Sequence, residues 1–578
     1  MVQKRRILQT FLAGVVCALV SWASAVYGSA SGYEVSIYSS VTPLFWILIA
    51  AAFALFTFGI IEAANGGSRP LIGANLFGIT LVNGLLTALP ALRYKTYYTQ
   101  WDVWFHLSNA SNIVSTGHID LATNFYPPIH LLWSFLSEVG GYSVYGTGIY
   151  LGSVLAALSV PLTYVVASRL FRSPMIGSIS ASLAAIPLSV VGTFPSPWFY
   201  SLTTLLAVLL VATLQAERPT VPRTVCGIVT VTALVISHPI APVFLLLAIL
   251  LSSFSAKLVP TLKPETRDHG ANLASLLWRD LFAYVLIIYI SWISLLTLVL
   301  RLSISQLLDA ISAEGVVKPI SYGKFFTIPL LAKIFGATLI VAGYWLGGLV
   351  ILRRTRKTDL IRPAVNLIVS MTISGAILAI FFEGIAAGLF LGNFVDRPLN
   401  IIALLLPPVA AVFIADHRTT AKTENRRRAL VIMAISVPFL LALPSMLPSP
   451  YVALFNYQNT QQLYTSAGWA ADHIPDRQTV YSNSHFGRYA YFPLHTGQAN
   501  FSKLYNFQNT IPLNLTHLLE SSTNTSYLVL DKETIMVASM DLRAWSAPST
   551  RDVEMLNSVD SVFRIYDSGE VQVYEIDG

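Results

Sequence analysis

The stretch from Tyr97 to Asp120, YYTQWDVWFHLSNASNIVSTGHID, lies between long apolar runs of the chain. It carries two aspartates, two histidines, two tryptophans and a pair of tyrosines. A helix through it would place Asp102 and His106, four residues apart, on one face. Trp101 and Trp104 beside them are typical of a segment at the boundary between membrane and water. The stretch therefore predicts an amphipathic platform that holds a carboxylate against a membrane.

A plain anchoring loop is the alternative for the same stretch. In that interpretation Asp102 caps a helix or pairs with Arg93 or Lys95, and the aromatic residues only fix the loop at the membrane surface. The residues alone leave both interpretations open.

The composition places the whole chain in a membrane. Of 578 residues, 54% are hydrophobic and 11% are charged, whereas about a quarter of the residues of a soluble domain are charged. Apolar runs of roughly 20 residues recur along most of the chain, and each is long enough to cross a bilayer. The sequence therefore predicts a polytopic α-helical membrane protein.

The net charge of +7 does not indicate nucleic acid. The basic residues gather in short clusters beside apolar runs, as in MVQKRR at the start, RRTRK at 353–357 and KTENRRR at 422–428. Such clusters are typical of cytoplasmic loops. The two cysteines, Cys17 and Cys226, lie inside apolar runs, which argues against disulfides and cysteine metal sites.

The apolar runs predict about 13 transmembrane helices. The first run either is a retained helix, which we favour, or is a secretory signal peptide. The run at 225–254 is a hairpin if it breaks at His238-Pro239, and one long helix otherwise. The candidate spans are 7–28, 41–64, 71–92, 143–168, 175–194, 198–216, 225–254, 281–302, 327–352, 360–384, 397–415 and 429–446.

The charge bias predicts a cytoplasmic N-terminus. With that orientation the loop 93–142 lies outside, and so does the segment after the last span. We therefore predict a transmembrane domain over 1–446 and an extracytoplasmic α/β domain over 447–578. In the latter, a helix and a short strand are expected before residue 485, a buried strand at 526–531 and a hairpin at 563–576.

The loop and the tail resemble those of a known class of enzymes. The segment WDVWFHLSNASNIVSTGHID with the later FYPPIHLLW, and the tail GWAADHIPDRQTVYSNSHFGRYAYFPLHTG, are similar to GT-C membrane glycosyltransferases. That class includes protein O-mannosyltransferases, lipid A aminoarabinose transferases and oligosaccharyltransferase catalytic subunits. The resemblance is strongest to prokaryotic, especially archaeal, members.

Three departures qualify the resemblance. The tail lacks the WWDYG signature, which argues against a true oligosaccharyltransferase. The loop motif has one acidic residue where several relatives have a pair. Three spans precede the loop where many relatives have one, although the odd number still leaves the loop outside.

The resemblance implies sugar transfer from a polyprenyl or dolichyl phosphate donor to an acceptor hydroxyl at the outer face. Asp102 is the candidate general base that takes the hydroxyl proton. Arg397, at the predicted outer end of a late span, is the candidate for holding the lipid phosphate, because a guanidinium matches phosphate oxygens. Pairing with Asp396 or snorkelling is the alternative role for Arg397.

Further substrate contacts are assigned around these two residues. They are His106, Tyr126, His130, Glu383 and Arg301. The sequence shows no compact cluster of oxygen ligands, so a site without a metal is favoured. A divalent cation, Mg²⁺ or Mn²⁺, is the alternative, with Asp102, His118 and Asp120 as its candidate ligands.

Two other functions remain open. A transporter or flippase of lipid-linked sugars would need charges or broken helices near the middle of the bilayer. A noncatalytic receptor or assembly subunit would leave the loop without a catalytic requirement. The glycosyltransferase is the function that we expect, in a multi-pass protein of the cell membrane. Its expected partners are a lipid-phosphate sugar donor, a glycan, lipid-linked or protein acceptor, and membrane lipids.

Overall fold

The structure of the chain is a computed structural model. It describes residues 2–27, 30, 32–95, 103–119, 124, 127–188, 221–237, 240–258, 270–295, 328–354, 368–378, 396–417, 423–447, 449, 451, 458, 460–475, 478–481, 506–508, 525–532 and 554–577.

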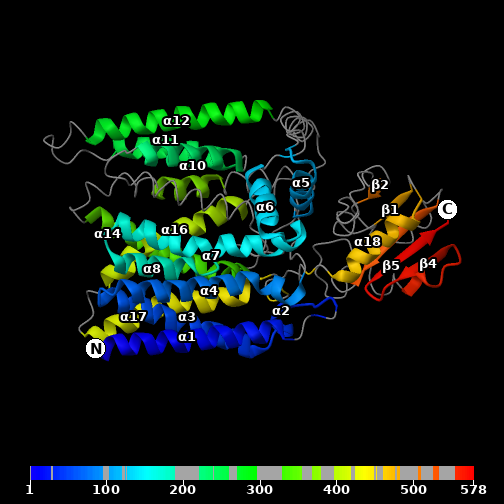
Figure 1. Ribbon diagram of the computed structural model, residues 1–578, viewed down its shortest axis with the longest axis horizontal. Helices are drawn as coiled ribbons and strands as arrows, with labels where there is room; N and C mark the ends of the chain where they lie inside the picture. Colours follow the sequence, from blue (N-terminus) through cyan, green and yellow to red (C-terminus); the bar gives the residue numbers. More distant parts are fainter. Residues whose placement is uncertain are drawn as a thin grey trace.

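Helices run lengthwise through most of the molecule, and a small sheet lies beyond one end of the bundle (Figure 1). The bundle helices are α1 (Val2–Val26), α3 (Pro43–Asn65), α4 (Arg69–Tyr94), α7 (Val144–Leu170), α8 (Pro174–Ala184), α10 (Val221–Ser237), α11 (Ile240–Leu258), α12 (Gly270–Leu295), α14 (Ile328–Arg354), a helix at Ile368–Leu378, α16 (Asp396–His417) and α17 (Glu424–Ala442). Shorter helices are α2 (Ile37–Ser40), α5 (Val103–Thr116), α6 (Pro127–Gly140), η5 (Leu443–Ser445) and α18 (Gln461–His473).

The chain is a multi-pass membrane protein. Within the described residues, 6 helices are long and apolar enough to cross a bilayer, and they belong to α1, α3, α4, α7, α14 and α17. The polytopic helical fold predicted from the sequence is therefore confirmed. The predicted number of about 13 spans stays a prediction, because 198–216 and other candidate spans lie wholly or partly outside the described residues.

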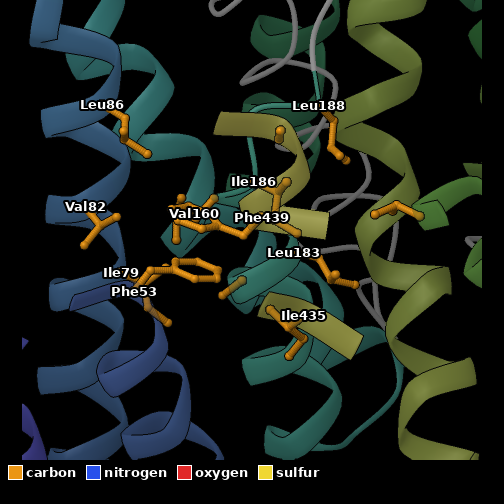
Figure 2. Packing of buried hydrophobic residues seen from close by; sticks show 14 of the residues in the cluster. Phe53, Ile79, Val82, Leu86, Val160, Leu183, Ile186, Leu188, Ile435 and Phe439 are labelled. Carbon is orange, nitrogen blue, oxygen red and sulfur yellow. The ribbon is translucent and has the colours of Figure 1, made fainter. Parts of the chain in front are cut away.

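Aromatic and branched side chains from five helices form the centre of the bundle. Phe53 of α3 stacks on Phe439 of α17, with ring centroids 3.7 Å apart and planes within 5° of parallel. Around this pair lie Ile79, Val82 and Leu86 of α4, Val160 of α7 and Leu183 of α8, as Figure 2 shows. Helices far apart in the sequence thus share one apolar core.

Helix α8 is shorter than the span 175–194 that the sequence predicts. It ends at Ala184, and the described residues that follow it, up to Leu188, are not helical. Pro187 has no N–H and disfavours helical geometry in the residue before it, which explains the stop. The Asn83 amide donates to the Ala185 carbonyl, and the Thr338 hydroxyl donates to the Leu188 carbonyl, so both backbone groups are satisfied inside the bundle.

Within the run 225–254 the structure describes two helices, α10, which ends at Ser237, and α11, which begins at Ile240. The His238-Pro239 pair, where the sequence places the possible break, lies outside the described residues. Leu234 of α10, Leu245 of α11 and Val285 of α12 belong to one apolar cluster.

The C-terminal sheet has five strands in the order β2-β1-β3-β5-β4. The strands are β1 (Thr479–Tyr481), β2 (Asn506–Gln508), β3 (Ser526–Asp531), β4 (Val562–Asp567) and β5 (Val571–Ile576). β1 pairs in parallel with β2 and β3, whereas β3, β5 and β4 pair antiparallel. The predicted buried strand and terminal hairpin are thus confirmed. Every residue of β3 is buried, because apolar clusters cover both of its faces.

The segment between α1 and α2 fastens the sheet to the bundle. The Glu570 carboxylate, in the β4–β5 turn, accepts from the Tyr33 N–H at 2.6 Å. The Gln458 side chain accepts from the Glu34 N–H at 2.6 Å and donates to the Gly32 carbonyl at 2.8 Å. The sheet is therefore held by backbone groups near the start of the chain.

Candidate functional site

Helices α5 and α6 form the described part of the loop between α4 and α7. α6 begins with Pro127 and Pro128, whose fixed φ and missing N–H suit the first turn of a helix. It ends at Gly140; in the next residue, Gly141, φ is +66°, and the Gly141 and Tyr142 N–H groups donate to the carbonyls of Glu138 and Ser137. The turn chemistry of the sequence thus fixes both ends of α6.

A chain of polar side chains is buried between these two helices. Nδ1 of His106, on α5, lies 2.7 Å from Nε2 of His130, on α6. Nδ1 of His130 lies 2.5 Å from the Oδ1 atom of Asn124. The two histidines are fully buried and Asn124 is almost so. Buried polar groups are costly unless hydrogen-bonded, so this chain fixes the relative position of α5 and α6.

The hydrogen bonds define the tautomers of the two rings. The Asn124 oxygen can only accept, so Nδ1 of His130 donates to it. Nε2 of neutral His130 then accepts the bond from Nδ1–H of His106. Neutral His106 therefore keeps its lone pair on Nε2, which makes that atom a hydrogen-bond acceptor or a base.

The environment keeps His130 neutral. Burial, followed by the neighbouring His106, holds the pKa of His130 well below its usual value. A neutral ring is what the tautomer pattern requires, because a protonated His130 would present two N–H groups and could not accept from His106.

Apolar packing and one hydrogen bond hold α6 to α7, and a second hydrogen bond joins α6 to α5. The indole N–H of Trp133, on α6, donates to the Val144 carbonyl at 2.6 Å, and the Ser134 hydroxyl donates to the Ala110 carbonyl at 3.0 Å. One apolar cluster contains Leu107 and Trp133 together with residues of α7, α18 and the sheet. The histidine chain thus lies on a rigid support.

An ion pair joins the C-terminal end of α4 to the segment that precedes α2. Arg93, which is nearly buried, makes a bidentate contact with Glu34: Nε donates to one carboxylate oxygen at 2.9 Å and Nη2 contacts the other. The pairing of Asp102 with Arg93, an alternative raised by the sequence, would have to share this arginine with Glu34.

Helix α16 begins on the same side of the bundle. Residues 418–423 link α16 to α17 and can reach about 20 Å, less than the roughly 33 Å length of α16. The two helices are therefore antiparallel. The Tyr38 hydroxyl of α2 donates to the carbonyl of Leu443, just after α17, so Asp396 and Arg397 lie toward the end of the bundle that carries α2.

The structure thus brings together some of the sequence-predicted residues and leaves others undescribed. His106 and His130 meet in the buried chain, and Arg397 is the second residue of α16, with its side chain outside the description. His118 is exposed, after the end of α5. Asp102, Tyr126, Asp120, Glu383 and Arg301 lie outside the described residues, although α5 begins directly after Asp102.

Two residues that hold the site together, Asn124 and Glu34, were not identified from the sequence. Asn124 lies in LATNFYPP, where a single polar residue before the turn gave no periodic signal. Glu34 is 59 residues from Arg93, so nothing local indicated their pairing. No group of three or more metal-ligating side chains is found among the residues that the structure describes, so the predicted cation ligands stay a prediction.

Comparison with known proteins gives a likeness of fold only. No protein-family profile matches the chain, and no curated protein matches it in sequence. Among solved structures it is similar to ArnT from Cupriavidus metallidurans bound to undecaprenyl phosphate. The TM-score is 0.45 and the identity 12%, over 86% of this chain and 97% of that one.

Two further solved structures show the same level of similarity. The oligosaccharyltransferase of Archaeoglobus fulgidus in complex with Zn and sulfate gives a TM-score of 0.47 at 12% identity, over 86% of this chain and 72% of that one. The mycobacterial arabinofuranosyltransferase AftD gives 0.47 at 14%, over 87% of this chain and 41% of that much longer one. These proteins are GT-C glycosyltransferases, the class that the sequence resemblance names. At such TM-scores and identities the likeness decides nothing about chemistry.

Proposed function

We propose that the chain is a membrane glycosyltransferase that moves a sugar from a polyprenyl phosphate carrier to an acceptor hydroxyl. The observation that carries the proposal is the buried chain of His106, His130 and Asn124, held at the end of the membrane helices directly after Asp102 in the sequence. A polar chain fixed in an apolar support provides the preorganisation that a catalytic carboxylate requires.

The reaction would take place at the outer face of the membrane. Basic residues gather at the end of the bundle opposite the sheet: Lys4, Arg5, Arg6, Arg69, Arg169, Arg172, Arg426, Arg427 and Arg428. The positive-inside rule makes that end cytoplasmic. The loop with α5 and α6, the start of α16 and the sheet are then extracytoplasmic, which agrees with a domain division near residue 447.

In this proposal Asp102 is the general base. Its carboxylate takes the proton of the acceptor hydroxyl as the oxygen attacks the anomeric carbon, and the bond from that carbon to the lipid phosphate breaks. His106, held by its bond to His130, orients Asp102 or binds a sugar hydroxyl. Arg397, with the N–H groups of the first turn of α16, stabilises the departing phosphate. None of these steps requires a metal.

The test is sugar transfer by the purified full-length protein in lipid nanodiscs, with a panel of polyprenyl phosphate sugars. Asp102→Asn should lower the transfer rate by roughly 10²–10⁴-fold without loss of folded protein. Asn112→Ala, at an exposed position of α5, is the matched control and should transfer at the normal rate. Unchanged transfer by Asp102→Asn would remove the base assignment while leaving the enzyme class.

A transporter of lipid-linked sugars is the second candidate, because α8 ends inside the bundle. Its 11 residues span about 16 Å, roughly half of the hydrocarbon thickness. Broken helices at such a depth are typical of transport sites. Movement of a labelled lipid-linked sugar across the membrane, without transfer from any donor, would favour this candidate.

A further inference from the structure

The helix α6 has its serine and histidine side chains inside and several of its large apolar side chains, with the charged Glu138, outside. The side packed against the protein includes His130, Ser134 and Ser137 beside Ile129 and Trp133. The exposed arc carries the large apolar residues Leu131, Phe135, Leu136 and Val139, of which Phe135 is 63% and Val139 71% exposed. Glu138 lies at the edge of this arc, beside Leu131, where a charged side chain can reach the headgroup layer. A helix on the surface of a soluble protein shows the reverse distribution.

The neighbouring helix α5 has the distribution that water favours. Among the side chains of α5 that the structure describes, from His106 onward, the exposed ones are Ser108, Ser111, Asn112, Ser115 and Thr116, which at helical spacing lie on one face. Its buried residues include Leu107 and Ala110. The two helices of one loop therefore expose different kinds of surface.

The membrane-spanning helix α7 shows the same inversion as α6. Its exposed residues include Tyr150, Val154 and Leu158, whereas Ser153 and Ser159 are buried. α7 begins at Val144, four residues after α6 ends, so the apolar surface of α6 leads by way of the 72%-exposed Tyr142 toward the lipid-facing surface of α7.

The direction and length of α6 exclude a crossing of the bilayer. α6 stands crosswise to the bundle helices in Figure 1. Its 14 residues span about 21 Å, and the hydrocarbon core is about 30 Å thick. A short crosswise helix with one apolar face is suited to the plane of the membrane interface.

We propose that the exposed apolar face of α6, made of Leu131, Phe135, Leu136 and Val139, binds the membrane surface and rests on the lipid acyl chains beneath the headgroups. The opposite side of the same helix carries His130. Contact with lipid thus sets the depth of the histidine chain relative to the layer of lipid phosphates. The proposal concerns a lipid surface and does not depend on the transfer reaction.

The experiment measures lipid contact at single labelled positions of the full-length protein. After Cys17→Ala and Cys226→Ser, the variants Phe135→Cys and Ser111→Cys each receive an environment-sensitive fluorophore. The proteins are placed in phosphatidylcholine–phosphatidylglycerol nanodiscs, with or without phosphatidylcholine brominated near the headgroup end of its chains. The label at 135 should be quenched several-fold more strongly than the label at 111.

Other outcomes would overturn the proposal. Equal quenching at 135 and 111 would place α6 in water. Protection of the label at 135 by a second protein copy, detected by cross-linking between chains, would assign the face to a protein partner. Val139→Cys provides a second label on the same face, so that one poorly folding variant does not decide the result.

Discussion

Helices α5 and α6 are equal in length, at 14 residues each, and pack against one another, yet they expose opposite chemistry. Among the described side chains, α5 exposes serine, asparagine and threonine, whereas α6 exposes leucine, phenylalanine and valine beside a single charged residue, Glu138. Their buried sides meet at His106 and His130. The difference indicates that two short helices are enough to bury the hydrogen-bonded His106 and His130. One helix has an outer surface suited to water, the other an outer surface suited to lipid, and the pair needs no large apolar core between them.

The comparison also shows that the same hydrophobic periodicity indicates a different orientation of the helix in water and at a membrane. An apolar arc on α6 would indicate a core-facing side in a soluble protein. Here that arc is exposed, and the polar arc with Ser134 and Ser137 is buried. Periodicity predicts that α6 is amphipathic but does not say which face points inward.

The largest effect is expected from the buried side of α6. Trp133→Ala should lower the free energy of unfolding by about 3–5 kcal/mol, because it leaves a cavity among α5, α6 and α7 and removes the bond to the Val144 carbonyl. Phe135→Ala, two residues away and 63% exposed, is the control. Thermal denaturation of the purified variants measures both. Equal losses would show that the two sides of α6 are not distinct.

A pH effect is expected from the chain between the helices. The pKa of His130 in the folded protein is depressed, so the unfolded state binds the proton first as the pH falls below about 6.5. Stability is therefore complete above that pH and declines below it, by up to about 1.4 kcal/mol per pH unit, until the folded pKa is reached. Thermal midpoints between pH 8 and pH 5 measure this decline.

The matched variant for this effect is His130→Gln. It removes the titrating group and keeps a polar side chain, so its stability should vary less over the same pH range. A decline of the same size in His130→Gln would assign the effect to other groups.

The smallest effect separates the two exposed faces. Val139→Asp should destabilise the protein in nanodiscs by up to about 1 kcal/mol, the cost of a charge near the membrane interface. Asn112→Asp on α5 should change stability by less than about 0.5 kcal/mol, as surface substitutions usually do. Chemical denaturation in the same lipid compares them, and an equal response would contradict the assignment of α6 to lipid.

Local chemistry explains what the sequence could predict. Pro127, Pro128 and Gly141 define the ends of α6, and the apolar run at 526–531 defines β3, because turn residues and periodicity act over a few positions. Pro187 also carried the signal for the early end of α8, but the apolar run around it dominated the prediction of a full span.

Contacts between distant segments could not be predicted in this way. The pair of Arg93 with Glu34 and the bond of His130 to Asn124 depend on how helices and loops are placed in three dimensions. His106 and His130 were each identified as candidates from the residues around them, but the 24 positions that separate them gave no reason to expect contact. A single sequence gives residue types and local spacing, but it does not show which distant residues are in contact.

The fastening of the sheet has a consequence for the order of synthesis. Tyr33 and the Glu570 carboxylate that binds it are 537 residues apart. At about 5–20 residues per second, a ribosome needs roughly half a minute to two minutes between them. Arg93 emerges only 59 residues after Glu34, so their ion pair can form early. Until the β4–β5 hairpin has been synthesised, the ion pair of Arg93 with Glu34 can hold the segment around Tyr33 in the conformation that Glu570 later binds.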